Sequence, residues 1–190
     1  MALDIIEIGH PILREVATEV SKEALQSEET QTFIDELIDT RAQANGAGIA
    51  ANQVAVAKRI FVVEIRDNPR YPYKPEYPLT VMVNPKVTFL TEDRYSSFEG
   101  CLSIPNLRGV VSRCPKIKVT GLDRHGAELD FNVNGITAAT FQHELDHLDG
   151  ILFPDKVEDP KTFCTWNEFS ERYEDNFRKT VEQVEADYNS

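Results

Sequence analysis

Two histidines and a glutamate occur close together in the stretch QHELDHLDG, residues 142–150. His143 and His147 are four residues apart, so on a helix both side chains lie on one face, where they can bind a single metal ion. Glu144 can reach a water molecule on that ion without being a ligand itself, which is the position of a general base. The pattern predicts metal-assisted hydrolysis.

The same HExxH pattern also occurs by chance on solvent-exposed helices, and two observations argue against that here. The chain has four histidines, and two of them fall in this spacing. The preceding residues, ITAATF at 136–141, are largely apolar, so the helix is expected to be buried. Burying two imidazoles and a carboxylate together is costly unless an ion compensates. A metal site is therefore the better interpretation.

A catalytic metal of this type has a third protein ligand and one open position. A final histidine, as in HExxHxxGxxH, is excluded because Phe153 occupies that position. A downstream glutamate, as in a second class of metallopeptidase, is represented by Glu168 and Glu171. Because both fall on the predicted solvent face of the last helix, a metallopeptidase is kept as a weaker alternative.

The three cysteines provide the remaining candidates for the third ligand. Cys101 follows a glycine in EGCLS (99–103), Cys114 ends a strand, and Cys164 lies beside an apolar stripe, a common environment for a free cysteine. A non-catalytic protein with a structural zinc site is another alternative, with Cys101, Cys114, His143 and His147 as ligands. That site lacks the usual close cysteine pair and leaves Glu144 without a role.

The stretch GAGIAANQ (46–53) places little more than backbone and one amide side chain between a predicted helix and a strand. Gly46 and Gly48 leave the backbone bare there, and Gln53 supplies the amide. Taken alone, the stretch is equally consistent with a glycine-rich turn and a surface glutamine.

Together, GAGIAANQ, EGCLS and QHELDHLDG resemble the three signature motifs of the peptide deformylase family, in the family's order and with similar spacing. The resemblance extends over most of the chain. It implies one divalent metal ion, usually Fe²⁺, which Zn²⁺, Ni²⁺ or Co²⁺ can replace. The implied ligands are Cys101, His143 and His147. Glu144 is then the general base and acid, and Gln53 with the backbone N–H of Leu102 stabilises the oxyanion.

The resemblance also implies the substrate, which is the N-formylmethionine end of newly made polypeptides; the products are formate and a free amine. The methionine side chain is expected in an apolar pocket lined by Ile136, Ala139 and Thr140. Arg108 matches a position that helps to bind the substrate backbone, and an extended peptide is expected to pair with the bare backbone at Gly46 and Gly48 like an added strand. Glu99 and Arg113 are expected to form an ion pair that supports the cysteine loop. Asp146 is interpreted as a helix-surface residue or as a partner of a ligand histidine.

Both helices and strands must position these residues, and their order along the chain predicts an α+β fold. Apolar residues at helical spacing predict helices over 30–44, 135–148 and 162–188. Between them, β-rich runs predict strands at 59–65, 79–85, 107–113, 116–122 and 128–133. We expect antiparallel or mixed sheets around a central helix that carries HExxH, with N-terminal and long C-terminal helices. The four prolines of 69–78 predict an exposed loop.

Composition limits the class of protein. A length of 190 residues, with 41% hydrophobic and 27% charged residues, predicts one catalytic domain over residues 1–190. The net charge of −12 argues against binding to DNA or to an anionic membrane. Three cysteines, together with no signal-peptide pattern and no spanning apolar run, favour the cytoplasm. A monomer is expected.

The C-terminal segment indicates whether the ribosome is a partner, because some members of the family dock on the ribosome through a basic C-terminal helix. Residues 161–190 carry the basic residues Lys161, Arg172, Arg178 and Lys179. They also carry a larger acidic set: Glu168, Glu171, Glu174, Asp175, Glu182, Glu185 and Asp187. Since a net negative helix repels ribosomal RNA, at most weak ribosome contact is expected.

Overall fold

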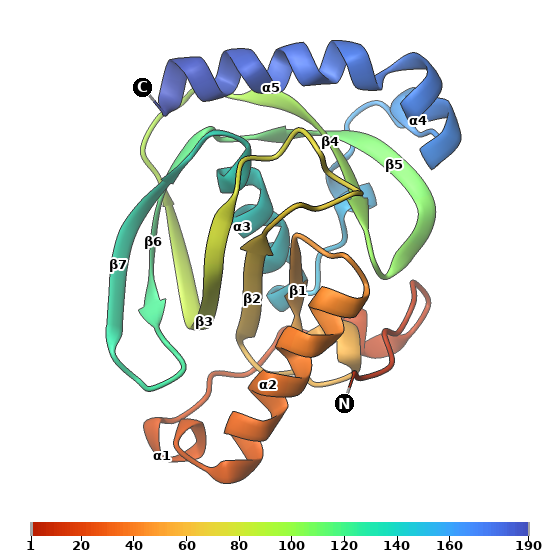
Figure 1. Ribbon diagram of the computed structural model, residues 1–190. Coiled ribbons are helices and arrows are strands. Elements are labelled where there is room, and N and C mark those ends of the chain that lie inside the picture. Colours follow the sequence, from red (N-terminus) through yellow and green to blue (C-terminus); the bar gives the residue numbers. More distant parts are fainter. Residues whose placement is uncertain (1, 190) are drawn as a thin grey trace.

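Two antiparallel sheets surround a central helix in the computed structural model, which describes residues 2–189 (Figure 1). The five-stranded sheet has the order β1-β2-β3-β6-β7, made of Gly48–Ala50, Ile60–Ile65, Tyr77–Phe89, Lys116–Leu122 and Glu128–Asn134. The two-stranded sheet pairs β4 (Tyr95–Cys101) with β5 (Ile104–Arg113). The central helix, α3 (Gly135–Leu148), carries the HExxH sequence.

The remaining helices lie outside these sheets. The N-terminal part contains the 3-10 turn η1 (Pro11–Arg14), the short helix α1 (Lys22–Leu25) and α2 (Glu28–Gln43). Ser21 and Ser27 cap α1 and α2 by accepting hydrogen bonds from backbone N–H groups. After α3 come η3 (Phe153–Lys156), η4 (Pro160–Thr162), α4 (Trp166–Arg172) and α5 (Glu174–Tyr188). None of the described helices has the length and apolarity needed to cross a bilayer.

The helix α3 is buried along almost its whole length, which explains its apolar first half. Phe141 packs edge-on against Phe61, Tyr77 and Phe131, with ring centroids 5.5–6.1 Å apart. The N-cap residue of α3, Asn134, makes no side-chain hydrogen bond to the first turn of the helix. Instead, the carboxylate of Glu185 accepts a hydrogen bond from Ile136 N at 2.7 Å. A negative group at this end is favourable because the helix N-terminus carries partial positive charge.

The predicted α+β fold around a central HExxH helix is confirmed. Helix α3 begins and ends as expected, and the five predicted strands are present as β2, β3, β5, β6 and β7. Two strands were not predicted separately. β1 is only three residues long and glycine-rich, and β4 has little alternation of apolar and polar residues.

The C-terminal helix, predicted to be continuous from 162 to 188, is divided at Tyr173 into α4 and α5. The break lets residues from both helices pack on one side chain of β4. Phe169 of α4 and Phe177 of α5 both contact Phe98, with ring centroids 5.1 and 5.7 Å away. Tyr173 itself stacks on the same ring at 5.5 Å.

The prediction of an exposed loop at 69–78 is wrong for its aromatic residues. The four prolines are exposed, but Tyr71 between them is 7% exposed. Its ring lies 5.9 Å from Trp166 and 6.4 Å from Tyr73, and Tyr73 packs edge-on against Phe177. These contacts fasten the loop to α4 and α5, because burying an aromatic ring outweighs the solvation preference of the surrounding prolines.

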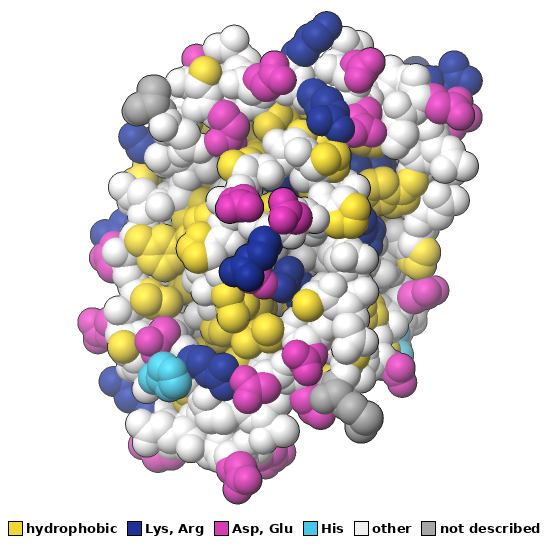
Figure 2. Space-filling model, viewed as in Figure 1, with side chains coloured by type: hydrophobic (Ala, Val, Ile, Leu, Met, Phe, Trp, Pro, Cys, Tyr) yellow, Lys and Arg dark blue, Asp and Glu magenta, His cyan; other side chains and the backbone are white. Residues whose placement is uncertain are grey.

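Helix α5 crosses the upper end of the molecule in Figure 1, above β4 and next to the start of α3. Its buried residues Phe177, Val181 and Val184 face inward, and the first two share a core cluster with Ile136 and Phe169. Figure 2 shows acidic and basic side chains mixed along this upper edge, with no basic patch on the face in view. Helix α5 is therefore a structural element of the core.

Replacing Phe177 by alanine is expected to lower the free energy of unfolding by about 3 kcal/mol, because it leaves a cavity between α5 and α3. The matched control is Lys179→Ala on the exposed side of α5, which should change stability by less than about 0.5 kcal/mol. A chain truncated after Pro160 should melt at a lower temperature than either variant. Thermal unfolding of the three proteins is the measurement; an unchanged melting temperature of the truncated chain would contradict the structural role.

Candidate metal centre and active site

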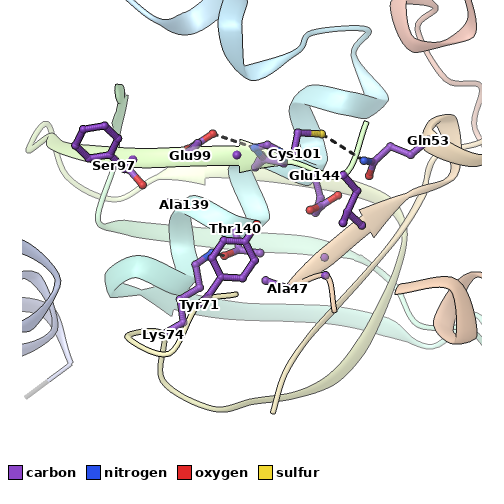
Figure 3. A pocket seen from close by; sticks show the side chains of 16 residues that line it. Ala47, Gln53, Tyr71, Lys74, Ser97, Glu99, Cys101, Ala139, Thr140 and Glu144 are labelled. Carbon is purple, nitrogen blue, oxygen red and sulfur yellow. Dashed lines mark hydrogen bonds and ion pairs between the residues drawn. The ribbon is translucent and has the colours of Figure 1, made fainter. Parts of the chain in front are cut away.

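One cavity gathers most of the side chains that the sequence singles out (Figure 3). Those expected to do chemistry line it as a group: Gln53, Cys101, Leu102, His143 and Glu144. Those expected to bind substrate follow on the adjacent walls: Gly46, Gly48, Ala139 and Thr140. His147 lies directly behind, with its Nε2 3.2 Å from Cys101 Sγ. Residues from β1, β4 and α3 are thus brought to one place.

Cys101, His143 and His147 form a cluster that could hold a metal ion. One ligand atom from each residue lies within 4.8 Å of the others; Cys101 and His147 are buried, and His143 is half-buried and lines the cavity. A thiolate and two imidazoles suit a first-row divalent ion, and three protein ligands leave a position open, as in catalytic sites. The donor set and its spacing therefore fit a divalent metal ion.

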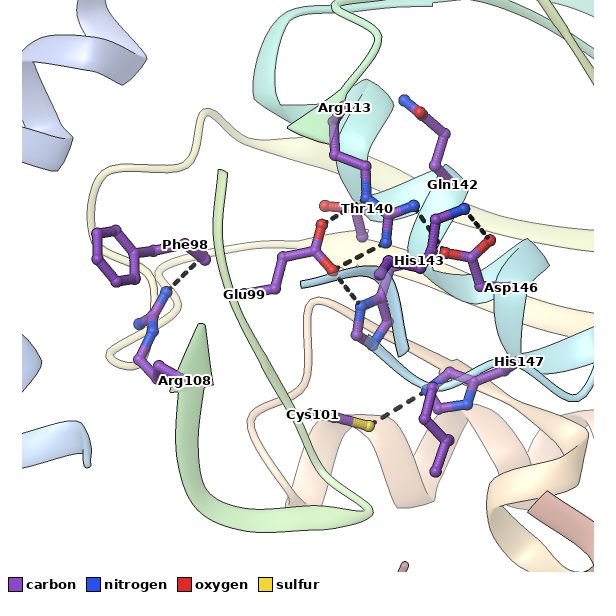
Figure 4. Close-up of polar contacts among 12 residues, drawn as sticks. Phe98, Glu99, Cys101, Arg108, Arg113, Thr140, Gln142, His143, Asp146 and His147 are labelled. Atoms are coloured by element: carbon purple, nitrogen blue, oxygen red, sulfur yellow. Dashed lines mark hydrogen bonds and ion pairs between the residues drawn. The ribbon is translucent and has the colours of Figure 1, made fainter. Parts of the chain in front are cut away.

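A buried carboxylate orients the first histidine (Figure 4). His143 Nδ1 lies 2.9 Å from Glu99 Oε2, and a donated hydrogen bond there leaves Nε2 for the ion. Arg113 donates to the same carboxylate from Nε at 2.6 Å and from Nη2 at 2.9 Å. Burial acts to raise the pKa of Glu99, but Arg113 and His143 outweigh it and lower that pKa, so the carboxylate stays charged.

Asp146 also belongs to this network. It accepts a hydrogen bond from Arg113 Nη1 at 2.7 Å and one from Lys156 Nζ at 3.1 Å, and it is 9% exposed. The interpretation as a helix-surface residue is therefore wrong, because this side of α3 packs against the buried Arg113, whose third donor bonds to Asp146. The expected Glu99–Arg113 ion pair lies at the centre of the network.

The second histidine is held neutral by its surroundings. Burial, and then the neighbouring His143, lower the pKa of His147 well below its usual value. The imidazole ring of His147 meets that of His143 edge-on, with the two centroids 4.9 Å apart. A neutral imidazole is the form that binds a metal ion.

Glu144 is buried, and its Oε2 atom has no hydrogen-bond partner within the described residues. Burial raises the pKa of Glu144 to about 7, although His143 and Lys74 oppose the shift. A carboxyl group that titrates near neutral pH can both accept and return a proton, which suits a general base. An unsatisfied buried carboxylate oxygen also marks the place where a water molecule or a reacting group would bind.

Gln53 is placed by the 3-10 turn η2 (Ala51–Val54), which follows β1 directly. Its Oε1 accepts a hydrogen bond from Ala50 N at 2.9 Å, and this contact fixes the orientation of the amide. Its Nε2 then points toward β4, 3.4 Å from Cys101 Sγ and 3.1 Å from Ser103 Oγ. A donor is thus held beside the proposed metal ligands.

The two glycines of this stretch allow close approach of other side chains. A β-carbon at Gly48 would overlap the Glu144 carboxylate, and one at Gly46 would lie 2.9 Å from Leu102 Cδ1. In the described part of the chain, β1 pairs with β2 and forms one edge of the five-stranded sheet. The pairing of an extended substrate with this edge stays a prediction.

Two residues expected to contact substrate lie elsewhere. Ile136 is fully buried in the cluster with Phe169 and Phe177, because α5 covers the start of α3. Arg108 is fully buried too: its guanidinium lies 3.8 Å from the Phe169 ring and 4.3 Å from Trp166. It donates to Phe98 O and to Tyr73 Oη at 2.7 and 3.0 Å. Neither side chain lines the cavity.

Two residues of the proline-rich loop, Tyr71 and Lys74, also line the cavity, and neither was among the site residues expected from the sequence (Figure 3). Lys74 Nζ donates to Thr140 Oγ1 at 2.8 Å. Burial lowers the pKa of Lys74 to about 8, although Glu99 opposes the shift. The signal that could have located them is the pair of tyrosines between the prolines, Tyr71 and Tyr73, because an exposed loop has no need of large aromatic side chains.

The alternatives for the metal site are not supported. Cys114 is fully buried in the hydrophobic core and lies outside the cluster of ligand atoms, and Cys164 is half-buried near Arg108. Glu168 and Glu171 are exposed on α4, and Glu168 pairs with Arg172 four residues on. Among the described residues, Cys101 is thus the third ligand that the geometry favours.

Comparisons with known proteins agree with this site. The family model for polypeptide deformylase matches residues 2–163. Peptide deformylase 2 of Nostoc sp. is 44% identical over 89% of this chain and 93% of its own length. A peptide deformylase of Leptospira biflexa is 39% identical over 84% of this chain and 89% of its own.

Solved structures show the same likeness. A class I type b peptide deformylase from Acinetobacter baumannii, bound to Met-Ala-Ser, superposes with a TM-score of 0.79 at 39% identity, over 83% of this chain and 99% of that one. One from Legionella pneumophila has a TM-score of 0.74 at 30% identity, over 95% and 97%. The shared fold, the matched sequence and the Cys-His-His cluster lead to one conclusion: this chain belongs to the peptide deformylase family.

Proposed function

We propose that the protein hydrolyses the formamide at the N-terminal formylmethionine of newly synthesised polypeptides and releases formate. The observation that carries the proposal is the convergence of Glu144, Gln53 and the cluster of Cys101, His143 and His147 on one cavity. The solved relative from Acinetobacter baumannii is bound to Met-Ala-Ser, a peptide that begins with methionine, and this supports the proposed substrate class.

The cluster would hold one divalent ion, and we propose Fe²⁺, with Zn²⁺, Ni²⁺ or Co²⁺ as possible replacements. When bound, the ion supplies Lewis acidity toward water and the formyl oxygen. Glu99 keeps His143 in the ligating orientation. The Cys101 thiolate makes the donor set softer than one of nitrogen alone, which is compatible with each of these ions.

Glu144 would carry the proton through the reaction. Its carboxylate accepts a proton from the attacking water, whose oxygen bonds to the formyl carbon. The C–N bond then breaks, and Glu144 returns the proton to the leaving amine, so water is divided between formate and the free N-terminus. The Gln53 NH₂ group and the backbone N–H of Leu102 would donate to the carbonyl oxygen as it gains negative charge.

The substrate backbone would lie along the free edge of β1, beside Gly46 and Gly48. Its first side chain would enter the cavity beside Ala139 and Thr140. Arg108 would then contribute indirectly: it holds the Phe98 carbonyl and thereby the course of β4, which carries Glu99 and Cys101. Ile136 would act through the packing of α3 against α5.

We further propose that the protein works as a cytoplasmic monomer with residues 1–190 as one catalytic domain. Acidic surface charge argues against binding DNA or an anionic membrane. The apolar side of α5 faces the core, and α5 carries more acidic than basic residues, so this helix does not suit docking on ribosomal RNA.

The decisive test is formate release from formyl-Met-Ala-Ser under anaerobic conditions with Fe²⁺-loaded protein. The acetyl-Met-Ala-Ser peptide is the matched control, because the larger acyl group tests whether the site is built for formyl. Release of formate without release of acetate is expected. Equal hydrolysis of both peptides, or of neither, would refute the proposal.

Replacing Glu144 by alanine should leave metal content unchanged and lower kcat by a factor of about 10² to 10⁴, the usual range for a general base. Metal analysis and steady-state kinetics on the same preparation measure both quantities. Substantial activity in the correctly metallated variant would exclude this role for Glu144.

Removing the Cys101 thiol by Cys101→Ala should abolish metal binding, because two histidines alone hold a divalent ion weakly. Cys114→Ala and Cys164→Ala are the matched controls and should retain one ion per chain. Metal content after dialysis distinguishes them; equal loss in Cys101→Ala and Cys114→Ala would favour a four-ligand structural site instead.

Ribosome co-sedimentation across a salt series should detect only weak binding with little salt dependence, since α5 carries more acidic than basic residues. Tight binding at low salt that falls steeply as salt rises, and disappears on truncation after Pro160, would contradict this expectation.

A further inference from the structure

A groove continues outward from the catalytic cavity, between the proline-rich loop and α4. Cys101 and Leu102 line both the cavity and the groove, so the two hollows adjoin. Beyond them, the loop contributes Arg70 to the groove and α4 contributes Trp166. The groove, at ≈ 550 Å³, has far more room than the cavity, at ≈ 40 Å³. A chain whose first residue lies in the cavity can therefore continue in the groove.

The groove begins where the proposed path of the substrate backbone ends. A β-carbon at Gly46 would lie 2.9 Å from Leu102 Cδ1, and Arg70 Nη1 donates to Ala44 O at 3.5 Å. Two groove residues, Leu102 and Arg70, thus adjoin the segment that leads into β1. A peptide that runs along the free edge of β1 and leaves past Gly46 would enter the groove with its second and third residues.

Two guanidinium groups lie beside the Trp166 ring of this groove. The Cζ atom of Arg70 is 4.9 Å from the ring centroid and that of Arg108 is 4.3 Å from it. Within residues 2–189, Arg70 donates to a backbone carbonyl, and Arg108 donates to a carbonyl and to the hydroxyl of Tyr73. Neither arginine pairs with a carboxylate in this described range. Two positive charges without counter-charges favour an anion nearby.

The acidic residue of the groove already has a partner. Glu174, at the start of α5, lines the groove. Its Oε1 atom accepts hydrogen bonds from Arg178 Nε at 3.2 Å and from Arg178 Nη2 at 2.7 Å. The charge of Glu174 is thereby compensated, whereas that of Arg70 is not. The groove is therefore locally positive in a protein whose net charge is −12.

We propose that this groove binds the second and third residues of the substrate and favours a carboxylate side chain there, with Arg70 as the specificity-determining residue. Arg70 is half-buried, and its guanidinium lies near the rings of Trp166 and Tyr71. A guanidinium on an aromatic ring keeps N–H groups free to donate to both oxygens of a carboxylate. The inference rests on the proposed deformylase activity and narrows its substrate class to formylmethionine followed by an acidic residue.

The test compares two series of peptides, formyl-Met-Xaa-Ala-Ala amide and formyl-Met-Ala-Xaa-Ala amide, with Glu, Gln or Lys as Xaa. The C-terminal amide is needed because a free terminal carboxylate could itself pair with Arg70. In at least one series, kcat/KM should be higher for Glu than for Gln by about two- to fivefold, the usual strength of a partly exposed ion pair. The Lys peptide should be the poorest of the three.

Replacing Arg70 by glutamine removes the charge and should bring the ratio of Glu to Gln close to one. Arg66→Gln is the matched control, because it makes the same change of net charge at an exposed position just after β2. It should leave the ratio unchanged. An equal ratio in Arg70→Gln and in the unmodified protein would overturn the inference, as would a preference for Lys, which would indicate that Glu174 controls the groove.

A measurement on the unmodified protein keeps the inference testable if Arg70→Gln fails to fold. The ratio of Glu to Gln should fall toward one as NaCl rises from about 0.05 to 0.5 M, because salt screens a partly exposed ion pair. A ratio that is constant across this range, or that never exceeds one at either position, would overturn the inference. No formate from any of the peptides would instead refute the proposed function.

Discussion

The buried ion pair between Glu99 and Arg113 is the interaction on which the site depends. Glu99 lies on β4, Arg113 ends β5, and their contacts continue to His143 and Asp146 on α3. Removing either charge would leave the other buried and unpaired, which typically costs 3–5 kcal/mol. Three elements from distant parts of the chain are thereby held at one relative position, and Cys101 meets the histidines only in that arrangement.

Around this centre, the later part of the chain completes the walls. The family model ends at residue 163, and α4 and α5 follow it. Trp166 and Phe169 cover the Arg108 guanidinium, and Trp166 also fixes Tyr71 above the cavity. Packing beyond the residues that the family model matches therefore determines how the proline-rich loop meets the candidate site.

The sequence predicts those residues whose chemistry demands a type and a spacing. His143 and His147 share one face of any helix, and the β-rich runs predict strands whatever their partners. The positions of Lys74 and Arg108 could not be predicted in this way. Lys74 bonds to Thr140 across 66 residues, and Arg108 to Tyr73 across 35. Such pairs depend on how separate elements dock, and no local pattern records that.

The carboxylate that Glu185 places at the start of α3 has a consequence for how the protein matures. A polypeptide emerges from its N-terminus during synthesis, and its early parts can fold first. The two sheets and the HExxH helix can therefore assemble while this cap is still absent. The first turn of α3 gains its acceptor only after residue 185 has emerged, so the helix that carries both histidines reaches its final rigidity among the last events of folding.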